Sequence, residues 1–136
     1  PICGSVTVLQ PGVAIVDYDN SHLKLPYAPK WDGQVGVRYS FDAGNAGSLN
    51  LESTVNYTSR QETNLLNYDF GDRKPMTTWD ASIGFVDKDE RFRVLVWGRN
   101  LTNNVGRLFM QVVNPNFTFA FPTEPRTWGV TLSASF

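Results

Sequence analysis

The sequence predicts an all-β fold, an antiparallel meander of transmembrane β-barrel strands. Five segments alternate apolar and polar residues with a period of two, which is typical of a strand whose two faces meet different surroundings. The connections between these segments alternate between short and long. Aromatic residues stand near the ends of the apolar faces and aliphatic residues stand between them, as on the outside of a membrane barrel.

The five predicted strands cover residues 34–41, 48–59, 77–86, 91–100 and 127–136. The last is the clearest, because Trp128, Val130 and Leu132 share one face and the chain ends on the aromatic Phe136. In the second strand, only Ser53 interrupts the apolar face. The fourth strand is mixed, since a leucine and a tryptophan stand among its polar positions.

The connections suggest on which side of a membrane each strand ends. Residues 42–47 and 87–90 are short and rich in Gly, Asn and Asp, which suit tight turns. Residues 60–75 and 101–126 are long, polar and contain proline. Short turns on one side and long loops on the other are typical of a meander threaded through a membrane.

Two further parts of the chain are less regular. Phe117, Phe119 and Phe121 alternate in the last long connection, which would allow a hairpin to extend beyond the membrane there. Residues 1–33 are expected to form an irregular, loop-rich lead-in. Within it, "SVTV" and "VAIVDY" are candidate strands separated at Pro11-Gly12.

The predicted strand directions sort the residues by depth and by face. The aromatic residues expected near the short turns are Tyr39, Phe41, Phe85, Phe92 and Phe136, and those near the long loops are Tyr57, Trp79 and Trp128. The opposite face is expected to line a wet lumen, and its charged members are Arg38, Glu52, Asp80, Arg93 and Arg99. Two roles remain open for these charges: contact with a plug or an anionic ligand, or an internal network that keeps the wall hydrated.

The amino-acid composition argues against several classes of function. The net charge of −1 gives no basic surface for nucleic acid, so no nucleic-acid partner is predicted. With one cysteine and one histidine, Cys3 and His22, the chain offers neither an internal disulfide framework nor a His/Cys metal cluster. No catalytic or phosphate-binding motif is present, so the expectation is a protein that is not an enzyme and needs no cofactor.

Three stretches resemble the C-terminal region of TonB-dependent outer-membrane receptors. They are "LPYAPKWDGQVGVRYSF" (25–41), "FRVLVWGRNLTNN" (92–104) and "PRTWGVTLSASF" (125–136). The first resembles the Pro-containing approach to a barrel strand, the second the penultimate strand and its Asn-rich end, and the third the final strand with its terminal aromatic residue. They stand in the same order as in that family.

The resemblance implies that residues 1–136 are the C-terminal portion of such a receptor's barrel, without the plug domain and the earlier strands. It implies that Trp128, Val130, Leu132 and Phe136 form the signature read by the barrel-assembly machinery. The implied partners are outer-membrane lipid, the rest of the barrel with its plug, that machinery, and TonB through the absent N-terminal part.

The implied location is the outer membrane of a Gram-negative bacterium. The implied function is import of a scarce nutrient such as siderophore-bound iron, a vitamin or a glycan, and no residue selects among these. Two alternatives are a complete eight-stranded outer-membrane barrel with a structural or adhesion role, and a soluble β-sandwich binding module. The upstream reading frame distinguishes a receptor from a small barrel, and solubility without detergent would favour the sandwich.

Overall fold

The computed structural model describes residues 6–10, 13–16, 19–65, 67, 72–114 and 117–135. In this part of the chain the regular elements are β-strands and one short 3₁₀ turn, η1 (Gly44–Ala46). No helix among these residues has the length and apolar character needed to cross a membrane.

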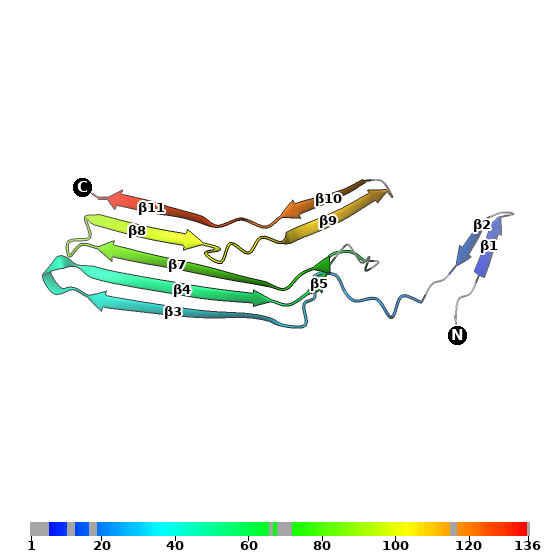
Figure 1. Ribbon diagram of the computed structural model, residues 1–136, viewed down its shortest axis with the longest axis horizontal. Coiled ribbons are helices and arrows are strands. Elements are labelled where there is room, and N and C mark those ends of the chain that lie inside the picture. The colour runs from blue at the N-terminus through cyan, green and yellow to red at the C-terminus, as the bar shows by residue number, and fades with distance from the viewer. Residues whose placement is uncertain are drawn as a thin grey trace.

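The central element is one five-stranded antiparallel sheet with the order β11-β8-β7-β4-β3 (Figure 1). Its strands are β3 (Asp32–Asp42), β4 (Ser48–Thr58), β7 (Met76–Val86), β8 (Phe92–Arg99) and β11 (Thr127–Ala134). Long strands that follow one another in the chain are neighbours in the sheet, which makes the sheet a meander. The predicted fold class and all five predicted strands are confirmed.

The two short turns depend on small or acidic residues at fixed places. Gly47 follows η1 at φ 123°, and a Cβ at this position would collide with the Val86 carbonyl, so the turn requires glycine. Asp42 Oδ1 accepts a hydrogen bond from the Gly44 N–H at 2.8 Å. In the second turn, Asp87 Oδ1 accepts one from the Phe92 N–H at 2.6 Å.

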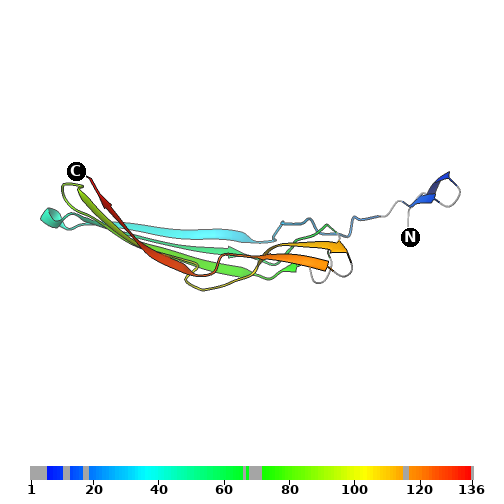
Figure 2. The same cartoon turned by 90° about the horizontal axis from the view of Figure 1, so that it is seen from above.

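Three short antiparallel ladders accompany the sheet. They are β1 (Val6–Gln10) with β2 (Val13–Val16), β5 (Gln61–Glu62) with β6 (Asp72–Arg73), and β9 (Arg107–Asn114) with β10 (Phe117–Pro122). β1 and β2 lie on either side of residues 11–12, and they stand apart from the sheet in both views (Figures 1 and 2). The hairpin β9–β10 occupies the last long connection, where the alternating phenylalanines allowed one. The ladder β5–β6 was not predicted.

The register places apolar residues beside apolar residues across the whole sheet. One row of paired positions is Tyr39, Leu51, Ile83, Val96 and Val130, and the next toward the short turns is Phe41, Leu49, Phe85, Val94 and Leu132. Most intervening positions carry polar residues, such as Arg38 paired with Glu52 and Glu52 paired with Ser82, and the exceptions on β8 are Leu95 and Trp97. The sheet therefore has one apolar face and one polar face.

The apolar face is uncovered. Figure 2 shows the sheet as a single curved layer, and in the described residues no second sheet packs against it. Trp128 is 77% exposed, Leu132 74% and Val35 72%. A β-sandwich would bury this face between two sheets, so the arrangement counts against the sandwich alternative. β3 and β11 are the two edges of the sheet.

Candidate functional site

The apolar face carries the first set of residues singled out from the sequence. Trp128, Val130 and Leu132 lie on it, at successive same-face positions of β11. Their exposed fractions are 77%, 56% and 74%. The fourth member of the predicted assembly signature, Phe136, lies outside the described residues. Exposed apolar surface that continues across five strands indicates contact with another apolar phase or partner.

The polar interruption of this face at Ser53 has a hydrogen-bond partner. Ser53 of β4 lies diagonally opposite Trp79 of β7, and the Trp79 indole Nε1 donates a hydrogen bond to Ser53 Oγ at 2.9 Å. The indole N–H has an acceptor and the Ser53 oxygen has a donor, which lowers the cost of placing these groups on an apolar surface without water. The break in alternation at Ser53 is therefore compatible with an apolar environment.

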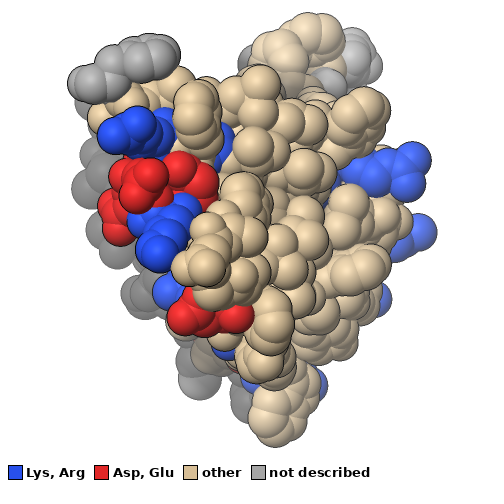
Figure 3. Space-filling view, turned by 90° about the vertical axis from the view of Figure 1, so that its left-hand side faces the viewer, with Lys and Arg blue, Asp and Glu red and all other residues tan. Residues whose placement is uncertain are grey.

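The polar face is held by hydrogen bonds that run from strand to strand. Arg38 Nη2 of β3 and Glu52 Oε1 of β4 form an ion pair with a distance of 3.0 Å. On the same face the Ser40 hydroxyl donates to Asn50 Oδ1 at 2.7 Å. Seen from the short-turn end, the acidic side chains and some of the basic ones lie along one side of the view, further basic side chains lie at the opposite edge, and a broad uncharged surface lies between them (Figure 3).

The other three predicted charges of this face take no part in that ion pair. Asp80 Oδ1 accepts a hydrogen bond from the Asn100 N–H at 2.7 Å. The Arg99 guanidinium carbon lies 5.7 Å from the centre of the Trp97 ring, a cation–π contact. Among the described residues, no ion pair joins Arg93, Arg99 or Asp80 to an opposite charge. The structure thus joins Arg38 and Glu52 in an ion pair and leaves the remaining three charges without one in the described part of the chain.

A groove of about 440 Å³ runs along the polar face between β4 and β8. Its lining includes Glu52, Asp80, Trp97 and Arg99. The groove offers two carboxylates, one guanidinium and one aromatic ring, a set that suits contact with a polar surface or ligand. Among residues with a described position, no cluster of three or more metal-ligating side chains occurs.

The turn that follows β8 contains a buried polar residue, Asn100, that was not among the predicted site residues. Asn100 is only 6% exposed and has φ 47°. Its Nδ2 donates to the Glu124 carbonyl at 2.9 Å and to the Asn104 carbonyl at 3.2 Å. Its Oδ1 accepts from the Thr102 hydroxyl and from the Asn104 N–H. One side chain therefore hydrogen-bonds to both ends of the last long connection. In the sequence, only its position in the stretch "GRNLTNN" could have indicated this role.

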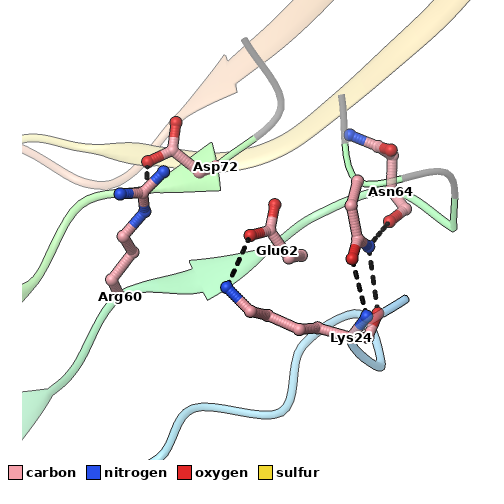
Figure 4. A network of polar contacts seen from close by, with 6 residues as sticks. Lys24, Arg60, Glu62, Asn64 and Asp72 are labelled. Carbon is pink, nitrogen blue, oxygen red and sulfur yellow. Dashed lines mark hydrogen bonds and ion pairs between the residues drawn. The ribbon is translucent and has the colours of Figure 1, made fainter. Parts of the chain in front are cut away.

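A second polar cluster lies at the long-loop end of the sheet (Figure 4). Arg60 Nε lies 2.7 Å from Asp72 Oδ2, and Lys24 Nζ lies 3.8 Å from Glu62 Oε1. The Tyr27 N–H donates to the Glu62 carbonyl at 2.9 Å. These contacts fasten the connection between β4 and β7 to the segment that precedes β3, and they explain why the short ladder β5–β6 forms there.

One carboxyl in the described lead-in has a displaced pKa. The hydroxyl and the backbone N–H of Ser21 hydrogen-bond to Asp19, and they lower the pKa of the Asp19 carboxyl because they favour its charged form. Asp19 is fully exposed and lies outside both faces of the sheet, so this shift bears on the lead-in and not on the candidate site.

Comparison with known proteins supports the fold of the chain. No known protein family and no curated protein sequence matches the chain. Among solved structures, the chain is similar to the ferric yersiniabactin uptake receptor FyuA from Yersinia pestis, with a TM-score of 0.75 and 20% sequence identity. The similarity covers 91% of this chain and 20% of the receptor. The chain therefore spans about a fifth of the length of that receptor and shares the fold of the matched part.

Proposed function

We propose that this chain is the C-terminal portion of the barrel wall of an outer-membrane TonB-dependent receptor, which imports a scarce nutrient. The observation that carries the proposal is the register of the sheet, because it collects the apolar residues of five strands on one exposed face and polar residues on the other. The structural similarity to an uptake receptor and the three sequence motifs support it.

In this proposal the apolar face contacts lipid. A single sheet layer with an uncovered apolar face is stable only where that face meets an apolar phase, and closed barrels are the sheet form that meets this need in membranes. The edge strands β3 and β11 then pair with other strands of the same barrel, since lipid does not satisfy their free backbone groups. The plug domain and the earlier strands belong to other parts of the receptor.

The polar face then lines the lumen. Arg38, Glu52, Asp80, Arg93 and Arg99 are the charged residues proposed to face it. Trp128, Val130 and Leu132, together with Phe136, are proposed to form the signature that the barrel-assembly machinery recognises. The proposed cargo class is siderophore-bound iron, a vitamin or a glycan, taken up with energy delivered through TonB.

The test is expression of this chain behind a signal peptide in a Gram-negative host, with and without the strands that precede it in the receptor. The expected result is degradation or aggregation of the chain alone, and heat-modifiable protein in the outer-membrane fraction when the missing strands are supplied. A chain that inserts alone as heat-modifiable protein would instead be a self-sufficient small barrel. Protein that stays soluble without detergent would contradict any membrane barrel.

A further inference from the structure

A pocket of about 580 Å³ lies where the two long connections meet at the end of the sheet. Residues Asp72–Met76 form one wall, and residues Asn104–Arg107 form the other. The first wall leads into β7 and the second leads into β9. The pocket is therefore built from segments about thirty residues apart, and it is separate from the groove on the polar face.

The pocket lies on the polar side of the sheet. Met76 pairs with Thr58 of β4, and that position belongs to the polar face by alternation along β7. Arg73 Nη2 lies 3.4 Å from Met76 Sδ. A Cβ built on Gly106 would lie 3.6 Å from the same sulfur atom. These contacts place both walls beside the Met76 side chain.

The charge of the pocket is positive. Its lining includes three cationic residues, Arg73, Lys74 and Arg107, and one carboxylate, that of Asp72. Asp72 Oδ2 already forms an ion pair with Arg60 Nε at 2.7 Å, so the charge of this carboxylate is compensated by a residue outside the pocket. No ion pair links Arg73 or Lys74 to a carboxylate in the described part of the chain.

Arg73 also has an unsatisfied donor. Its Nε is buried and has no hydrogen-bond partner. Buried donors in folded proteins nearly always have a partner. Because this Nε has no contact with solvent, an anion in the open pocket would meet the terminal nitrogens of the guanidinium and not Nε. The planar guanidinium forms paired, charge-assisted hydrogen bonds with carboxylate and phosphate groups, and a neighbouring lysine adds a further positive charge.

We propose that this pocket binds an anionic group, a carboxylate or a phosphate, with Arg73 as its main ligand. The inference rests on the proposed function for its location, because in a receptor barrel the long-loop end of the polar side is the mouth of the lumen. The source of the anion is then a soluble cargo and not a lipid headgroup, since lipid meets the opposite face.

The test uses the intact protein that carries this chain, purified in detergent, with citrate and inorganic phosphate as probes in isothermal titration calorimetry. Arg73→Gln should weaken citrate binding by about tenfold or more, as expected for the loss of a charged hydrogen bond. Arg73→Lys keeps the positive charge and loses the paired donors of the guanidinium, so it should retain more citrate affinity than Arg73→Gln. A purely structural role of Arg73 would make the two variants equally weak binders.

The matched control is Lys88→Gln, which removes one positive charge from an exposed short turn at the other end of the sheet. Its citrate affinity should equal that of the unmodified protein. An equal loss in Lys88→Gln and Arg73→Gln would mean nonspecific attraction and would overturn the pocket. Displacement of citrate by phosphatidylglycerol micelles would assign the site to a lipid headgroup and overturn the soluble cargo.

The two proposals fail in different ways. Protein that is not heat-modifiable and does not reach the outer membrane would contradict the proposed function. Protein that is heat-modifiable and membrane-inserted but binds neither citrate nor phosphate would contradict the anion pocket and leave the proposed function standing.

Discussion

The indole ring of Trp97 lies across the backbone of Gly129 on the neighbouring strand. The two residues are paired in the ladder of β8 and β11, and a Cβ built on Gly129 would lie 2.7 Å from Trp97 Cζ2. Trp97 Nε1 also donates a hydrogen bond to Thr131 Oγ1 at 3.3 Å. The ring therefore fills the space that a side chain at Gly129 would occupy on the polar face of β11. Together with the hydrogen bond to Thr131, it connects the last strand to the sheet.

Gly129→Val should displace this ring. The added side chain requires Trp97 to change its rotamer, and overpacking of this kind lowers the free energy of unfolding by about 1–3 kcal/mol. Urea unfolding of the detergent-solubilised protein measures the change. Gly33→Val is the matched control, because a Cβ at Gly33 meets nothing within 4 Å. If both variants unfold at the same urea concentration, the contact with Trp97 carries no packing role.

Asn100→Ala should loosen the last long connection. It leaves two backbone carbonyls and one amide without their side-chain partner and forces alanine to adopt φ 47°, so the free energy of unfolding should fall by about 2–3 kcal/mol. Asn100→Gly accepts the backbone conformation and should lose about 1 kcal/mol less. The temperature at which the folded gel mobility disappears gives the order of the variants.

The control for Asn100 is Asn103, which is exposed and has a similar φ of 52°. Its side chain accepts a single hydrogen bond, from the Arg126 N–H at 3.2 Å. Asn103→Gly should therefore cost less than about 1 kcal/mol. A larger loss for Asn103→Gly than for Asn100→Ala would show that the buried hydrogen bonds of Asn100 are not what holds the connection.

Alternation along the chain was enough to predict the long strands and their faces. The side-chain period of a strand is a local property, so Trp128, Val130 and Leu132 could be assigned to one face from β11 alone. The pairing of Arg38 with Glu52 was not predicted, because it depends on the exact register that the short turn between β3 and β4 imposes.

The long connections could not be predicted in the same way. The ladder β5–β6 has two residues in each strand, and it depends on contacts such as Arg60 with Asp72 that have no periodic signal. The role of Asn100 depends on carbonyls at Asn104 and Glu124, which only the folded chain brings near it. Pockets formed by two distant loops leave no trace in local sequence for the same reason.

The hydrogen bond between Trp79 and Ser53 should be stronger in lipid than it would be in water. A double-mutant cycle with Ser53→Ala and Trp79→Phe isolates it, and the expected coupling is about 0.5–1.5 kcal/mol for a pair with no competing water. Unfolding in lipid bilayers by urea supplies the four free energies. A coupling of zero would mean that water reaches this face, which would count against contact with lipid.

Val130→Arg tests the assignment of the two faces. Val130 is 56% exposed on the apolar face, midway along β11, and a guanidinium there should cost about 2–4 kcal/mol or block assembly, because the bilayer interior does not solvate the charge. Thr131→Arg changes the adjacent residue on the polar face and should be much milder, even though Thr131 loses the hydrogen bond from Trp97. The yield of heat-modifiable protein in the outer-membrane fraction reports both. Equal yields for the two variants would contradict the assignment of the faces, since only a difference in environment separates these neighbours.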